Sequence, residues 1–177
     1  MNSIPNNMRP RKIETWVIFA VVLLCVNLNP VSIFCQNAFD GIGYYDIDID
    51  YGKDILKYKT YLPDKKMIRD ELNYKIPQLI YVADNWFEPL KLCRIRVNYN
   101  YVRNDEMNEE CYYGGIKLKV SRYLKLLETD EFVFSEIFNE EFYVSLTNPT
   151  NEMIGNDALQ IMDALIDKLG LFYYKKD

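Results

Sequence analysis

The segment after Pro89 alternates apolar and polar side chains with a period of two. This alternation is typical of a strand in an antiparallel sheet that has one buried face and one solvated face. A chain that contains such a strand must build a sheet and cover one side of it. The expected buried face carries Cys93, Ile95, Val97, Tyr99 and Tyr101, and the expected solvated face carries Arg94, Arg96, Asn98 and Asn100.

A second alternating segment predicts that this strand is one arm of a hairpin. Residues 90–102 and 112–120 would form the two arms, with the turn near Glu106 and Met107. Ile116, Leu118 and Val120 alternate with lysines in the second arm, and the glycines at 114 and 115 allow a bulge before it.

The hairpin conflicts with a disulfide between Cys93 and Cys111. An even pair of cysteines in an oxidising compartment is usually bridged. The predicted hairpin places Cys93 opposite Val120 and Cys111 opposite Val102, which separates the sulfurs by about 30 Å along the strands. A disulfide needs Cα atoms within about 7 Å of each other. The hairpin spans more residues than the cysteine pair, so the bridge is disfavoured.

The remaining patterns complete an α+β prediction. A helix is expected after Pro149, with an apolar stripe from Ala158 to Leu169 and Gly170 as its C-terminal cap. A shorter helix is expected from Pro63 to Leu72. Further strands are expected at residues 41–51, 79–83 (buried), 132–134 and 142–146. The predicted fold is a mostly antiparallel sheet packed by the C-terminal helix and the shorter helix.

The first 35 residues have the layout of a secretory signal peptide. Arg9, Arg11 and Lys12 precede an apolar run from Trp16 to Val26, and Pro30 lies shortly after it. The run is shorter than the roughly 20 residues that span a bilayer. We therefore expect cleavage between residues 35 and 36, with retention as an anchor as the alternative. A lipid-modified Cys35 is disfavoured by the bulky residue before it. Residues 36–177 are then a single exported domain, periplasmic or extracellular.

Charge and composition exclude several classes of function. The full chain has a net charge of −5, and without the basic N-terminal segment it is −7. Nucleic acid requires a basic surface, so a nucleic-acid partner is excluded, and contact with a membrane is expected only through the signal segment. The 177 residues contain no histidine, which excludes the usual Ser-His-Asp and Cys-His systems and histidine-ligated metals. No cofactor is expected, and the sequence favours a protein that is not an enzyme.

Two acidic patterns are candidates for a functional site, one for metal binding and the other for catalysis. Asp46, Asp48 and Asp50 resemble the start of a calcium loop, but Tyr51 and Lys57 stand where that loop needs glycine and glutamate, so no metal site is predicted. Asp84 and Glu88 flank an aromatic pair and could form the two carboxylates of a small envelope hydrolase. This hydrolase is the first alternative function.

The favoured function is binding of another envelope or secreted protein, in particular a basic one. An acidic segment before two tyrosines is expected to form the contact surface, as in an inhibitor or immunity protein. Its residues are Asp105, Glu106, Glu109, Glu110, Tyr112 and Tyr113. The second alternative is a structural subunit of a surface assembly, in which residues 171–174 offer an edge for strand addition.

Overall fold

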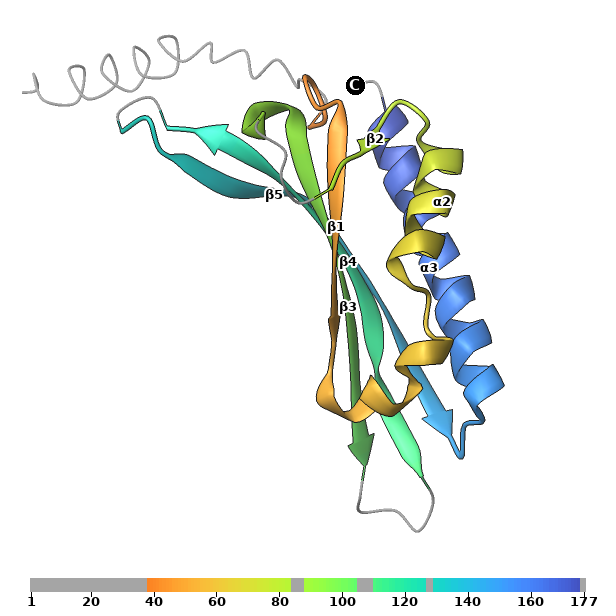
Figure 1. Cartoon of the computed structure of the whole chain (residues 1–177). Coiled ribbons are helices and arrows are strands. Elements are labelled where there is room, and N and C mark those ends of the chain that lie inside the picture. Colours follow the sequence, from red (N-terminus) through yellow and green to blue (C-terminus); the bar gives the residue numbers. More distant parts are fainter. Residues whose placement is uncertain (1–37, 84–87, 105–109, 127–128, 176–177) are drawn as a thin grey trace, which may run out of the picture. The chain divides into compact units, whose positions relative to one another are not determined.

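The computed structural model describes residues 38–83, 88–104, 110–126 and 129–175, which form an α+β fold (Figure 1). In these ranges the sheet has five strands in the order β2-β1-β3-β4-β5. β1 runs parallel to β2 and β3, whereas β3, β4 and β5 are antiparallel. The strands are β1 (Tyr44–Tyr51), β2 (Ile80–Tyr81), β3 (Leu92–Asn104), β4 (Cys111–Lys125) and β5 (Phe132–Thr147). The predicted fold class is confirmed: the sheet is open and mostly antiparallel.

Two α-helices cover one face of this sheet (Figure 1): α2 (Lys65–Lys75) and α3 (Asn151–Tyr174). Of two 3₁₀ helices, η1 (Lys53–Tyr61) lies between β1 and α2, and η2 (Pro89–Lys91) directly precedes β3. The predicted signal peptide lies outside the described residues, and so does its boundary with the domain. Within the described ranges, no helix is long and apolar enough to cross a membrane.

The core forms where the alternating strands meet the helices. The five inward residues predicted for β3 are all buried, as are Ile116, Leu118 and Val120 of β4. They join one cluster with the apolar stripe of α3, which includes Ile154, Ala158, Met162, Leu165 and Leu169. The period of two on the strands and the helical period on α3 therefore define the two sides of one core.

The β3–β4 hairpin is confirmed, but its predicted register was wrong by two residues. Cys93 lies opposite Arg122, and Cys111 lies opposite Asn104. A shift of two residues keeps every side chain on its own face, so the hydrophobic pattern does not distinguish the two registers. Both cysteines are buried free thiols, about 36 Å apart along the ladder.

Two further strand predictions need correction. The expected strands at 132–134 and 142–146 are parts of one 16-residue strand, β5. The segment 79–83, expected to be a buried strand, contributes only the two-residue edge strand β2, in which Ile80 is exposed. The irregularity in the β4–β5 pairing lies between Val120 and Ser121, not at the glycines.

The C-terminal helix continues through Gly170, which therefore does not cap it. Phe172 and Tyr173 of its last turn pack against Phe39, with ring centroids 6.1 and 5.0 Å apart. These aromatic contacts stabilise one more helical turn after Gly170. Residues 171–174 are thus helical, and they do not provide the strand edge that the structural-subunit alternative required.

Candidate binding groove between the two helices

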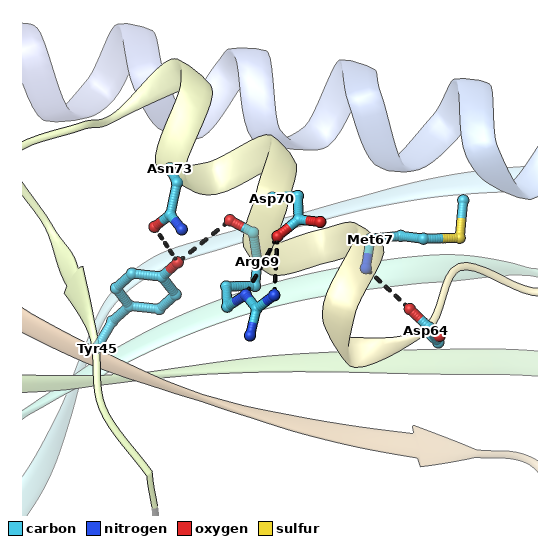
Figure 2. Close-up of polar contacts among 6 residues, drawn as sticks. All are labelled: Tyr45, Asp64, Met67, Arg69, Asp70 and Asn73. Atoms are coloured by element: carbon cyan, nitrogen blue, oxygen red, sulfur yellow. Dashed lines mark hydrogen bonds and ion pairs between the residues drawn. The ribbon is translucent and has the colours of Figure 1, made fainter.

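The start of α2 is held in place by contacts on either side of Pro63. The Asp64 carboxylate accepts a hydrogen bond from the backbone N–H of Met67 at 2.8 Å and so caps the helix (Figure 2). The hydroxyl of Tyr99, which is buried in β3, donates to the Pro63 carbonyl at 2.9 Å. The sheet therefore fixes the point at which α2 begins.

The inner side of α2 is tied to β1 by a buried tyrosine. The Tyr45 hydroxyl donates to Oδ1 of Asn73 at 2.8 Å and lies 3.4 Å from the Arg69 carbonyl oxygen (Figure 2). Burial raises the pKa of Tyr45 well above its ordinary value, so the hydroxyl remains a donor. Ile68 and Leu72 are buried on the same side of the helix. The adjacent side of α2, which carries Met67, Asp70 and Glu71, faces the space between α2 and α3.

An open groove runs between α2 and α3. Its main part encloses about 630 Å³, and an adjoining hollow near the start of α3 adds about 270 Å³. The two parts are continuous because Pro63, Met67 and Leu159 line both of them. Gly155 brings the start of α3 close to η1, since a Cβ atom there would lie 2.9 Å from the Tyr61 carbonyl oxygen.

The groove has apolar walls and an acidic rim. Met67 and Leu159 remain 47% and 46% exposed, and Met162 also lines the main part. The charged residues that line the groove are all acidic: Asp70, Glu71, Glu152 and Asp163. An arrangement of this kind can hold apolar side chains against the walls while the rim attracts cations.

One lysine lies beyond the rim, where the two helices meet. Lys75 Nζ is 2.6 Å from Asp167 and 3.7 Å from both Glu71 and Asp163. Its hydrogen bond to Asp167 raises the pKa of Lys75. Asp70 has its own partner, Arg69, at 3.0 Å. These two cations contact three of the four lining carboxylates, and four negative charges against two positive ones leave the groove with a net negative charge.

The acidic segment predicted as the binding surface is described only at its end. Asp105, Glu106 and Glu109 lie outside the described residues. Glu110 forms an ion pair with Lys57 and accepts a hydrogen bond from the Tyr112 hydroxyl at 2.6 Å. These contacts join the end of the segment to η1. The binding role of the segment stays a prediction.

The two predicted tyrosines differ in their surroundings. Tyr112 is buried, with its ring edge-on to Tyr58 at 5.8 Å, and burial raises its pKa to about 12. Tyr113 is exposed on the neighbouring position. Of the two rings, Tyr113 is therefore the one that faces solvent.

Three of the other acidic candidates pair with basic residues, one lies outside the described ranges, and Asp50 is exposed. Asp84 lies outside them, and Glu88 is exposed and pairs with Lys91 at 2.6 Å. Asp46 pairs with Arg94 and Asp48 with Arg96, each at 3.0 Å. Within the ranges that the structure covers, no three histidine, cysteine or acidic side chains form a group able to hold a metal.

Sequence reasoning missed the groove because its walls resemble ordinary core positions. Met67 belongs to the apolar side of the predicted short helix, and Met162 belongs to the stripe of the C-terminal helix. Leu159 was the available signal, since it lies off that stripe. Single exposed leucines are common on protein surfaces, so this signal alone does not predict a groove.

Comparison with known proteins adds only distant structural likeness. No family model matches the chain, and no curated protein matches it. A hypothetical protein from Chlamydia trachomatis is 7% identical with a TM-score of 0.38, covering 75% of this chain and 98% of that one. A neuraminyllactose-binding hemagglutinin homologue from Helicobacter pylori is 12% identical with a TM-score of 0.37, covering 76% and 81%. A minor lipoprotein from Acinetobacter baumannii is 10% identical with a TM-score of 0.28, covering 72% and 86%. At these scores the function must be argued from the groove itself.

Proposed function

We propose that this chain is an exported, non-enzymatic binding protein that holds a basic envelope or secreted protein in the groove between α2 and α3. One observation carries the proposal: four carboxylates and no basic residue line an apolar groove. Export is supported by the basic and apolar residues of the N-terminal signal pattern.

Charge complementarity explains the preference for a basic partner. The rim carboxylates and the net negative charge of the chain attract a cationic surface and speed its approach. Two of the wall residues, Met67 and Met162, are methionines. Because methionine is flexible and polarisable, such walls adapt to apolar side chains of different shapes.

The acidic segment at residues 105–110 supplies a second contact in this proposal. The ion pair of Glu110 with Lys57 and its hydrogen bond from Tyr112 fix the end of the segment to the domain. Asp105, Glu106 and Glu109 would then meet the basic partner, as in an inhibitor or immunity protein that enters a basic cleft.

The test uses two synthetic amphipathic helical peptides as probes, one of leucine and lysine and the other with glutamate in place of each lysine. We expect the mature protein to bind the lysine peptide, with an affinity that falls as the salt concentration rises. It should not bind the glutamate peptide. Fluorescence anisotropy of labelled peptides measures both affinities.

Two variants with the same change in net charge distinguish binding in the groove from nonspecific electrostatic attraction of the peptide to the protein. The groove variant combines Asp70→Lys with Asp163→Lys, and the control combines Asp50→Lys with Glu131→Lys on exposed positions away from the groove. The groove variant should bind the lysine peptide at least about tenfold more weakly than the control, a difference of ~1.4 kcal/mol. Equal affinities of the two variants would contradict the proposal, provided that both melt near the wild-type temperature.

A further inference from the structure

The far end of the β4–β5 hairpin continues beyond the rest of the sheet (Figure 1). The last pair between β3 and β4 is Cys93 with Arg122. After Arg122, β4 pairs only with β5, through Tyr123 with Phe134 and Lys125 with Phe132. We call residues 123–126 and 129–134 the arm.

The arm exposes apolar side chains on both of its faces. Successive residues of a strand point to opposite faces, so Phe132 and Phe134 share one face while Val133 lies on the other. The exposed fractions are 40% for Leu124 and Leu126, 46% for Phe132, 39% for Val133 and 47% for Phe134. Five exposed apolar side chains on so short an arm are a sign of a contact site.

One face of the arm is already ordered by aromatic contacts. The rings of Tyr123 and Phe134 lie 4.0 Å apart, and the Arg94 guanidinium lies 5.2 Å from the centre of the Phe134 ring. The arm is therefore an ordered extension of the sheet. These contacts hold the rings of Tyr123 and Phe134 in defined positions.

The arm also carries a free strand edge. In the described sheet β5 has β4 on one side and no strand on the other, whereas the opposite edge strand, β2, is only two residues long. Soluble proteins usually protect a long edge with lysine, proline or charged residues. Residues 132–135, Phe-Val-Phe-Ser, contain none of these.

We propose that this edge is the interface of a symmetric homodimer, in which β5 pairs antiparallel with β5 of a second copy around Val133. In this register Phe132 lies opposite the partner's Phe134, and the reverse pair forms across the symmetry axis. Val133 lies opposite its own copy, and Glu131 lies opposite Ser135. The pairing thus joins aromatic residues on one face and valines on the other. Two acidic residues, Asp130 and Glu136, come opposite each other only at the next position, where Asp130 lies before the start of β5.

Charge makes the β5 edge a better site for a second copy of the chain than the groove between α2 and α3. Two copies of a net negative chain repel each other, and the acidic groove would oppose self-association. The uncharged stretch 132–135 is where two copies can approach most closely. A symmetric pair uses the same edge of both copies and is therefore closed, and the edge that remains in each copy is the two-residue β2.

Crosslinking tests both the dimer and its register. Val133→Cys places one new thiol on the symmetry axis, and Tyr143→Cys places one on the same strand at a more exposed position (76% against 39%), so a lack of crosslinking there is not due to poor access. In the proposed dimer the two residues at 143 are about 66 Å apart along the strands. A short bismaleimide should therefore join Val133→Cys chains and leave Tyr143→Cys chains single. Cys93 and Cys111 are buried and do not compete.

Sedimentation equilibrium of the mature wild-type protein gives the independent measurement. We expect a monomer–dimer equilibrium, with the dimer dissociation constant raised by about tenfold or more in Val133→Lys, because two lysines would then face each other. A wild-type protein that stays monomeric at every concentration would overturn the proposal, as would a dimer that crosslinks through position 143. Thermal melting of each variant shows that it is folded.

Discussion

Asp46 and Arg94 are direct neighbours on the parallel strands β1 and β3, and their side chains form an ion pair at 3.0 Å. The Asp46 carboxylate is almost fully buried, at 4% exposed, although it lies on the sheet face away from the helices. Its burial comes from its partner, since Arg94 lies across it and continues onto the Phe134 ring. The hydrogen bond that Arg94 donates to Asp46 in turn raises the pKa of Arg94.

Replacing Asp46 with asparagine should destabilise the domain by about 1–3 kcal/mol, because a buried charge pair loses one partner and Arg94 is left uncompensated. Asp48→Asn is the matched control. Its pair with Arg96 occupies the next outward position but is about half exposed, so its loss should cost ~0.5 kcal/mol or less. Urea unfolding of both variants measures the difference. Equal losses would mean that the burial of Asp46 has no energetic consequence.

Tyr45→Phe should lower the free energy of unfolding by about 1 kcal/mol through loss of the hydrogen bond to Asn73. The phenyl ring keeps the apolar contacts, so only the polar contact is tested. In an Asn73→Ala background the same substitution should cost clearly less, and a double-mutant cycle by urea unfolding gives the coupling. Additive effects would show that the two side chains do not stabilise each other.

Gly114→Ala should destabilise the domain by about 3 kcal/mol or more, because the new Cβ atom has no room. It would lie 1.8 Å from the Asn100 carbonyl oxygen, a backbone atom that a side-chain rotation does not relieve. Gly43→Ala is the control, since no atom lies within 4 Å of a Cβ atom there. Thermal melting of the two variants should separate them clearly. A Gly114→Ala protein with the same melting temperature as Gly43→Ala would contradict this account.

The sequence predicted those elements whose pattern is set by a single buried face. The alternation in β3 gave the correct inward residues because all five are buried against the helices. The alternation in β1 places Asp46 on the same face as Asp48 and Asp50, but it does not show that Asp46 alone of the three is buried. Its burial depends on Arg94 in a strand that lies 48 residues further along the chain. The local pattern contains no information about that pairing.

The groove could not be predicted from the sequence for a related reason. Its walls come from two helices separated by more than 75 residues, and each wall residue has an ordinary explanation within its own helix. The end of α3 was misplaced because glycine usually ends a helix, while the contacts of Phe172 and Tyr173 with Phe39 outweigh that preference here. Long-range packing decided both outcomes.

The two cysteines of the folded domain, Cys93 and Cys111, should be unbridged thiols that react only after unfolding. Cys93 and Cys111 are buried, and burial raises the pKa of Cys93 to about 12, so little thiolate forms at neutral pH. A thiol reagent should therefore label neither cysteine in buffer and both in denaturant. An intact mass lighter by two hydrogen atoms after secretion would instead reveal a disulfide and refute the β3–β4 register.

The ion pair between Glu110 and Lys57 should make part of the domain's stability depend on acid pH. Contact with Lys57, followed by the hydrogen bond from Tyr112, lowers the pKa of Glu110 below its ordinary value of 4.5. A carboxyl with a lowered folded-state pKa contributes stability above its unfolded pKa and loses that contribution as the pH falls through the folded pKa. The same contact raises the pKa of Lys57, so the lysine stays charged throughout this range.

Glu110→Gln should therefore be less stable than the wild type at pH 7, and the difference should shrink as the pH falls below 4.5 and vanish in stronger acid. Urea midpoints measured from pH 7 to pH 2 give this difference directly. Glu131→Gln serves as the control, because Glu131 is exposed and has only a weak contact with Thr129. If the difference for Glu110→Gln stays constant into strong acid, the charge of Glu110 is not what stabilises the end of the acidic segment.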